Sequence, residues 1–141
     1  KMKKISFIFM LFWAAGGILA GCDNTLDGSG TYEPLYLEVA VSDSLGNTYT
    51  GDSIVIPTDK NKIIFDISTN SGWRASRENK VGLNGWLSIP SKAAGGGDAV
   101  ITSTVVANLT SKDKKVYYYI LTTDSAVVRK IVIVQPHPSK Q

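Results

Sequence analysis

The sequence predicts an all-β domain: an immunoglobulin-like antiparallel β-sandwich of about seven strands, preceded by a lipoprotein signal peptide that is cleaved. Three observations lead to this fold class. Apolar segments recur at intervals of about ten residues, turn-forming residues separate them, and no amphipathic helical period follows the N-terminal apolar run. The chain has one cysteine, so no internal disulfide can form, and we expect packing alone to hold the sandwich together.

The first half of the domain supplies two half-buried strands with shorter strands between them. In residues 35–41, and again in residues 62–68, apolar side chains occupy every second position, so each segment has one buried and one wet face. Residues 48–50 are expected to pair briefly. Residues 54–56 form a strand that ends at Pro57, because proline cannot donate to a sheet ladder.

The second half is predicted to contribute the remaining strands. Trp73 and Trp86 bracket a short strand and a loop. The glycines at 95–97 are expected to form a mobile turn, because glycine favours neither strand nor helix. Three segments rich in valine, threonine and tyrosine are then predicted as strands: residues 99–107, 116–123 and 127–135.

The N-terminus has the composition of a secretory signal peptide. Three lysines among the first four residues form a basic start, and a nearly unbroken apolar segment, residues 5–19, follows them. This segment is short for a membrane span, which needs about 20 apolar residues. The Leu-Ala-Gly-Cys sequence at positions 19–22 resembles the bacterial lipobox, in which a diacylglyceryl group is attached to the cysteine and the chain is cut before it. An ordinary signal peptide with a chance cysteine is the alternative.

The lipobox resemblance implies the organisation of the whole chain. Residues 1–21 are the expected signal peptide, Cys22 the lipidated first residue, residues 22–34 a polar tether, residues 35–136 the sandwich and residues 137–141 a C-terminal tail. We therefore expect a protein of the cell envelope. The lipid on Cys22 would hold it at the outer membrane, and its periplasmic or surface orientation is left open.

The charge distribution argues against nucleic acid as a partner. The formal net charge is +3, with 15 Lys and Arg against 12 Asp and Glu. Three of the basic residues precede Cys22 and all the acidic residues follow it, so the mature chain would carry 12 of each. The overall basicity therefore belongs to the signal peptide, and the lipid is the only expected link to a membrane.

Five short motifs in the domain carry a family resemblance. They are Asn-Ser-Gly-Trp at 70–73, Trp-Leu-Ser-Ile at 86–89, the glycines at 95–97, Ala-Asn at 107–108 and Ile-Val-Ile-Val-Gln at 131–135. Together with the earlier strands they resemble a BACON domain (Bacteroidetes-associated carbohydrate-binding often N-terminal) over residues 35–136. The chain departs from the family where a usual arginine is replaced by Lys114 or Lys115. The resemblance implies an all-β, carbohydrate-binding module of exported proteins concerned with polysaccharides.

We expect no catalytic activity, no cofactor and no metal. The single histidine, His137, lies between two prolines in the tail, where no scaffold would hold it as a general base. A lipidated Cys22 is lost to thiol chemistry and to zinc binding. Five aspartates, at positions 52, 59, 98, 113 and 124, fall at predicted turns, whereas glycoside hydrolysis requires two carboxylates facing each other across a cleft.

Carbohydrate binding requires exposed aromatic rings, on which the C–H faces of sugars stack. Tyr36 points away from the apolar face of its strand, and Trp86 and Tyr118 are the other candidate ligand contacts. Core packing is the alternative for Trp73 and Trp86, because large aromatics dominate the cores of small sandwiches. The orientation of Tyr118 stays open, since both faces of its strand are apolar.

Three Asp-Ser pairs followed by an apolar residue resemble the acceptor site of bacterial periplasmic O-glycosylation. They make Ser44, Ser53 and Ser125 candidate glycosylation sites. Ordinary turn formation is the alternative, because aspartate and serine side chains bind local backbone groups. The N-glycosylation sequon at Asn108 is expected to form a turn.

Two functions from different classes follow from these observations. The first is a lipid-anchored, non-catalytic module that binds glycans or assists polysaccharide use. The alternative is a structural spacer or a protein–protein interaction module of the cell envelope. An exposed aromatic strip would favour the first, and an exposed apolar patch or unpaired strand edge would favour the second.

Overall fold

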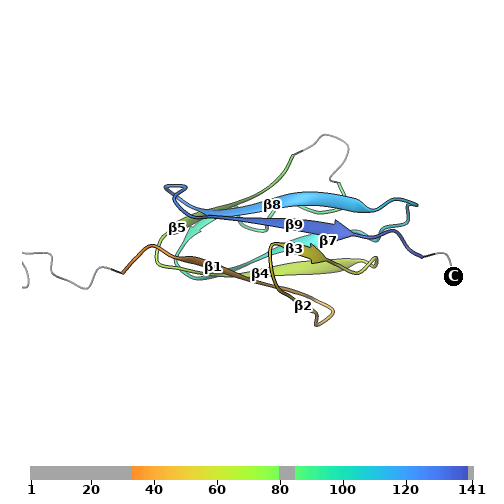
Figure 1. The fold of residues 1–141 in the computed structure, drawn as a ribbon, viewed down its shortest axis with the longest axis horizontal. Helices are drawn as coiled ribbons and strands as arrows, with labels where there is room; N and C mark the ends of the chain where they lie inside the picture. Colours follow the sequence, from red (N-terminus) through yellow and green to blue (C-terminus); the bar gives the residue numbers. More distant parts are fainter. Residues whose placement is uncertain (1–32, 80–84, 140–141) are drawn as a thin grey trace, which may run out of the picture. The chain divides into compact units, whose positions relative to one another are not determined.

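The computed structural model describes residues 33–79 and 85–139. These residues contain nine strands and no helix: β1 Leu37–Asp43, β2 Thr48–Tyr49, β3 Ser53–Val55, β4 Asn61–Thr69, β5 Gly72–Arg77, β6 Ala94–Gly96, β7 Ala99–Val105, β8 Lys114–Thr122 and β9 Val128–Gln135. One sheet has the order β2-β1-β4-β7 and the other β3-β9-β8-β5-β6. Figure 1 shows the two sheets as stacked layers. The predicted all-β sandwich is confirmed.

One strand pair departs from the antiparallel pattern. β3 runs parallel to β9, with Ile54 in register with Ile133. The chain leaves the first sheet after β2 and passes through Gly51, whose φ of 82° lies in the left-handed region that favours glycine. Because β3 enters the second sheet from the first, it lies beside the last strand of the domain rather than beside its neighbour in sequence.

The predicted strand segments coincide with observed strands, and their ends shift by at most two residues. The glycine segment at 95–97 is different, because Ala94–Gly96 form strand β6 at the edge of the five-stranded sheet. Its backbone crosses the buried indole of Trp73, and a Cβ at Gly95 would lie 2.5 Å from Trp73 Cζ2. The prediction of a mobile turn is therefore wrong, since close packing explains Gly95.

This close approach predicts a large difference between two adjacent glycines. Gly95→Ala is expected to destabilise the domain by about 1–3 kcal/mol, because the new methyl group overlaps the Trp73 ring. Gly96→Ala is the matched control, since its Cβ would meet no atom within 4 Å, and its effect should stay within about 0.5 kcal/mol. Urea denaturation of both variants measures the difference. Equal midpoints would contradict the packing explanation.

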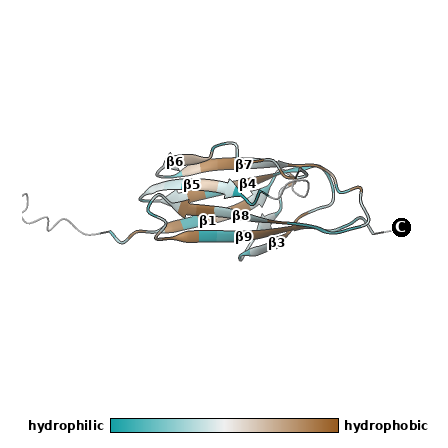
Figure 2. Ribbon diagram, turned by 90° about the horizontal axis from the view of Figure 1, so that it is seen from above, coloured by the Kyte–Doolittle hydropathy of each residue, from teal (hydrophilic) through white to brown (hydrophobic). Residues whose placement is uncertain are grey.

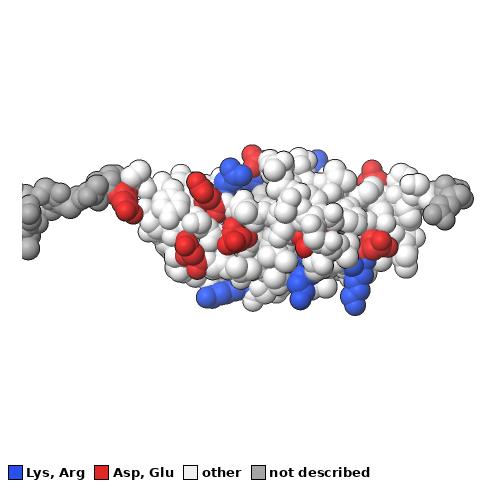
Figure 3. All heavy atoms as spheres, turned by 90° about the horizontal axis from the view of Figure 1, so that it is seen from below, with Lys and Arg blue, Asp and Glu red and all other residues white. Residues whose placement is uncertain are grey.

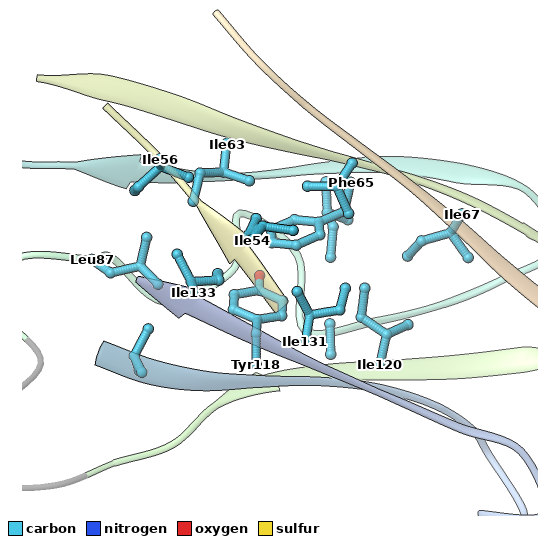
Figure 4. Packing of buried hydrophobic residues seen from close by; sticks show 14 of the residues in the cluster. Ile54, Ile56, Ile63, Phe65, Ile67, Leu87, Tyr118, Ile120, Ile131 and Ile133 are labelled. Carbon is cyan, nitrogen blue, oxygen red and sulfur yellow. The ribbon is translucent and has the colours of Figure 1, made fainter. Parts of the chain in front are cut away.

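The core lies between the two sheets. Figure 4 shows apolar side chains from both layers meeting there, with the ring of Tyr118 directed away from β8 toward the other sheet. That ring stacks on Phe65 of β4, with ring centroids 4.3 Å apart and an interplanar angle of 18°. Trp73 is fully buried and its Nε1 donates to the carbonyl oxygen of Gly97 at 3.0 Å. Trp86 is 6% exposed, so both tryptophans belong to the core.

Two buried amides close one end of the sandwich. Gln135, at the end of β9, donates from Nε2 to the carbonyl oxygens of Val106 at 3.0 Å and Thr58 at 3.1 Å. Asn108 donates from Nδ2 to the carbonyl oxygen of Pro136 at 2.9 Å, and its Oδ1 accepts hydrogen bonds from the following turn. Asn108 is buried. Its side-chain amide stabilises the turn that was expected at this position.

The predictions for the signal peptide, for Cys22 and for most of the tether concern residues 1–32, which lie outside the described residues. Across residues 33–79 and 85–139, no helix is long and apolar enough to cross a membrane. Lipidation of Cys22 and an outer-membrane location stay predictions.

Candidate ligand-binding face

Two tyrosines point outward from the central region of the five-stranded sheet. Along β8, Val116, Tyr118 and Ile120 are buried, whereas the alternate residues Tyr117 and Tyr119 are half-buried on the outer side. Successive side chains of a strand point to opposite faces of the sheet, so the buried position of Tyr118 places its two neighbours outside.

We call the surface around these rings the tyrosine face. Tyr119 is in register with Ser76 of β5 on one side and with Lys130 of β9 on the other, and Tyr117 is in register with Val132. Figure 2 looks onto this sheet and shows a hydrophilic segment of β9 between hydrophobic ends. The tyrosine face comprises the outward residues Val55, Arg74, Ser76, Lys115, Tyr117, Tyr119, Lys130 and Val132.

Two lysine ammonium groups lie over the tyrosine rings. The Nζ of Lys130 is 4.2 Å from the ring centroid of Tyr117 and 6.0 Å from that of Tyr119. The Nζ of Lys115 is 5.3 Å from the Tyr117 centroid. These are cation–π contacts, which contribute about 0.5–1 kcal/mol at exposed sites. Within the described residues, neither phenol hydroxyl has a hydrogen-bond partner, so both can bind a ligand.

Positive side chains outnumber negative ones on the tyrosine face. Arg74, Lys115 and Lys130 lie on it, and the acidic residues beside it are Glu78, whose backbone N–H donates to the carbonyl oxygen of Tyr117 at 2.8 Å, and Asp113, which directly precedes β8. The guanidinium of Arg74 donates to the carbonyl oxygen of the residue after β8 at 3.0 Å, which holds it beside the β8–β9 turn.

The outer surface of the four-stranded sheet has a different charge pattern. Glu38 of β1 and Asp66 of β4 point outward there, with Lys62 at the other end of β4. Figure 3 looks at the molecule from this side, and its acidic groups are spread over the surface while most basic groups lie toward the rims. The two outer faces of the sandwich therefore differ in their charge.

The structure corrects two of the three aromatic candidates. Trp86 and Tyr118 are buried, and the Tyr118 hydroxyl lies 3.1 Å from Ser103 Oγ inside the core, so neither ring can contact a ligand in this fold. Burial also raises the pKa of Tyr118 to about 12. Tyr36 is 40% exposed, as expected, but it precedes β1 of the other sheet, where its backbone N–H donates to Asn70 Oδ1.

Sequence reasoning missed Tyr117 and Tyr119 as candidate contacts. The signal was present in their spacing, because residues two apart on a strand share a face. Lys115 continues the same alternation as the two tyrosines, and a lysine marks the wet side of a strand. Lys114, however, continues the alternation of Tyr118, so the lysines alone do not decide which face of the strand is outside.

The three candidate O-glycosylation serines differ in how free their hydroxyls are. Ser44 Oγ donates to Asn61 Oδ1 at 2.8 Å, which engages it in the fold. Ser53 is exposed at the start of the edge strand β3. Ser125 is exposed in the β8–β9 turn with a φ of 61°, and its Oγ accepts a long hydrogen bond from Arg74 Nη2 at 3.5 Å. The aspartate before Ser125 accepts hydrogen bonds from local groups, so turn formation accounts for that pair, and modification of the serines stays a prediction.

A histidine–aspartate pair and a pocket also lie in the part of the chain that the structure describes. His137 Nδ1 lies 2.7 Å from Asp113 Oδ1, and both side chains are more than half exposed on the surface. No group of histidine, cysteine, aspartate and glutamate side chains suited to a metal occurs among the residues that the structure describes. An apolar pocket of about 280 Å³ lies between β5 and the segment before β6, lined by Ala75, Ser76, Arg77, Asn79, Ile89, Pro90 and Ala93.

No family model and no curated protein matches this sequence. Among solved structures, the chain is similar to a Bacteroides ovatus GH5 xyloglucanase in complex with a XXXG heptasaccharide, at 20% identity and a TM-score of 0.54. That match covers 74% of this chain and 19% of the xyloglucanase, so the chain spans about a fifth of its length. The chain is also similar to a protein from Bacteroides thetaiotaomicron solved by NMR, at 10% identity and a TM-score of 0.51. That match covers 79% of this chain and 94% of the other chain. At these identities the similarity shows a shared fold.

Proposed function

We propose that this chain is a non-catalytic envelope lipoprotein of the BACON type whose sandwich binds a polysaccharide through the tyrosine face. One observation carries the proposal: Tyr117 and Tyr119 point outward together from a central strand, with unpaired hydroxyls among the described residues. The fold similarity to part of a xyloglucanase in complex with a heptasaccharide supports a role in polysaccharide recognition. The proposal includes a lipid on Cys22 that holds the module at the outer membrane. The mass of the mature N-terminus, which would include this lipid, tests that part of the proposal.

The geometry of the tyrosine face suits an extended sugar chain. Two residues along a strand span about 6.6–6.8 Å, so the two rings are close enough to contact neighbouring sugar units. Sugars stack their C–H faces on aromatic rings, and their hydroxyls need polar partners at the sides. Ser76 and Lys130 flank Tyr119 in the sheet register and supply such partners.

The positions of the acidic and histidine side chains favour binding without catalysis. Asp43 and Asp124 accept hydrogen bonds from nearby backbone and side-chain donors, which gives both carboxylates a structural role. His137 lies on the exposed C-terminal segment and its partner Asp113 directly precedes β8, and both side chains are more than half exposed. None of these groups faces a second carboxylate across a cleft, as glycoside hydrolysis requires.

Removing the two outward rings tests the proposed function. The double variant Tyr117→Ala/Tyr119→Ala is expected to lose at least about tenfold in affinity for a retained polysaccharide, because the stacking surface is gone. Tyr36→Ala is the control, since Tyr36 is exposed on the other sheet. Affinity electrophoresis in gels that contain single polysaccharides measures both, with circular dichroism to verify folding.

Two results would contradict the proposal. Retention of the double variant at the wild-type level would remove the tyrosine face from the binding site. Failure of the wild-type domain to bind any polysaccharide would favour the alternative, a protein-interaction module or spacer of the envelope. Val55 on the edge strand β3 is 62% exposed and Val128 is 51% exposed, which gives that alternative a structural basis.

A further inference from the structure

The lysines on the tyrosine face constrain the charge of the proposed ligand. Lys130 and Lys115 both approach the ring of Tyr117, at 4.2 and 5.3 Å from its centroid. The two ammonium groups therefore lie within about one Debye length of each other, roughly 8–10 Å. Among the described residues, neither lysine forms an ion pair with a carboxylate. An anion bound between them would relieve their mutual repulsion.

Other side chains in the sheet strengthen this positive potential. Outward positions on β8 and β9 are occupied by Lys115, Tyr117, Tyr119 and Leu121 and by Val128, Lys130, Val132 and Val134, so neither strand presents a carboxylate on this side. Arg74 adds a third cation on β5, and the acidic neighbours Glu78 and Asp113 offset part of this positive charge.

Lys130 also makes a neutral sugar an unfavourable ligand. A sugar ring that stacks on Tyr117 must displace the ammonium group that now lies over it. A neutral sugar then loses the cation–π contact without replacing it by a charged partner. A sugar that carries a carboxylate or sulfate lets the displaced ammonium group form a charge-assisted hydrogen bond, which is about twice as strong as a neutral one.

We propose that the ligand of the tyrosine face is an anionic polysaccharide, with a sugar ring stacked on Tyr117 or Tyr119 and its carboxylate or sulfate held between Lys115 and Lys130. This inference rests on the proposed glycan-binding function and adds the ligand's chemical class. Electrostatic complementarity gives the specificity, and aromatic stacking distinguishes the site from a surface that adsorbs any polyanion.

The experiment compares polysaccharides that differ in charge alone. Polygalacturonate is tested against its fully methyl-esterified form, and dextran sulfate against dextran, at low and at high salt. We expect polygalacturonate to bind at least about tenfold more tightly than the ester at low salt, and added salt to remove this difference. A preference for dextran sulfate over polygalacturonate would identify sulfate rather than carboxylate as the recognised group.

Single lysine variants assign the effect to the tyrosine face. Lys130→Gln is expected to weaken polygalacturonate binding about tenfold and to strengthen binding of the ester, because no ammonium group then has to be displaced from the Tyr117 ring. Lys62→Gln removes the same charge from the outer surface of the opposite sheet and should change neither. Both lysines are exposed, so folding should survive.

Each contrary result has its own meaning. Equal binding of acid and ester, with no effect of Lys130→Gln, would overturn the anionic class and leave the glycan-binding function standing. Binding of no polysaccharide would overturn the function itself. Equal binding of dextran sulfate and polygalacturonate by the wild type and by the Tyr117→Ala/Tyr119→Ala variant would show adsorption by charge alone and overturn both.

Discussion

Replacing Tyr118 by alanine is expected to destabilise the domain by about 3–5 kcal/mol, a large part of the stability of a small domain. The ring is fully buried between the sheets and stacks on Phe65 at 4.3 Å. Its removal leaves a cavity that the surrounding β-sheets cannot close, and it leaves the hydroxyl of Ser103 without its partner in the core. The free energy of unfolding in urea measures the loss.

Two further variants separate the parts of this effect. Tyr118→Phe keeps the ring and removes the hydroxyl, so it should cost about 1 kcal/mol. Tyr119→Ala removes the same side chain from the next position, where it points outward, and should also cost about 1 kcal/mol. If Tyr118→Ala and Tyr119→Ala were equally destabilising, the assignment of inward and outward faces on β8 would be wrong.

Local sequence patterns predicted the strands because each pattern reports a local property. Apolar and polar side chains alternate in residues 62–68, which predicts a strand with one buried face. Buried and more exposed residues alternate in β4 over Asn61–Thr69 in the same way. The same reasoning left β8 undecided, since valine, isoleucine, leucine and tyrosine occur on both of its faces. The orientation of Tyr118 depends on which face meets the other sheet, and the stacking on Phe65, far away in sequence, settles it.

Contacts between distant parts of the chain explain what the sequence did not predict. Local composition predicts a mobile turn at Gly95, whereas the role of this glycine comes from the Trp73 ring on the neighbouring strand. The parallel position of β3 beside β9 is likewise a property of the whole domain. The tyrosine face follows the same rule, since Lys130 reaches Tyr117 from the adjacent strand.

Asp43 shows how a residue expected in an ordinary turn becomes a buried organising group. Its carboxylate accepts hydrogen bonds from the backbone N–H groups of Leu45 and Asn47, at 3.0 and 2.9 Å. Side-chain donors come from Asn47 at 2.9 Å, Tyr49 at 2.5 Å and Asn61 at 2.9 Å. The carboxylate thus ties the β1–β2 turn to the start of β4, and Asp43 is only 4% exposed.

These hydrogen bonds set the ionisation of Asp43. Burial by itself would raise the pKa of Asp43 above its ordinary value of 3.8, but the donors on Asn47, Tyr49 and Asn61 together outweigh burial and hold the pKa well below that value. The unfolded chain therefore binds this proton more readily than the folded chain. The contribution of Asp43 to stability is complete above about pH 5 and is lost progressively as the pH falls through 4 toward the lowered pKa.

Asp43→Ala is accordingly expected to cost about 3 kcal/mol at pH 7, because it leaves several donors of a buried cluster unpaired. The difference in unfolding free energy between the wild type and this variant should shrink below pH 4, where the wild type begins to lose the same interactions. Asp66→Ala, on the exposed outer face of β4, is the control and should lie within about 0.5 kcal/mol of the wild type at pH 7.

Asp113 and Asp124 also have lowered pKa values, through hydrogen bonds from His137 and from Thr122 and Ala126, but both are exposed and are present in every variant. A difference between wild type and Asp43→Ala that stays constant from pH 7 to pH 2 would show that Asp43 acts through packing rather than through its charge.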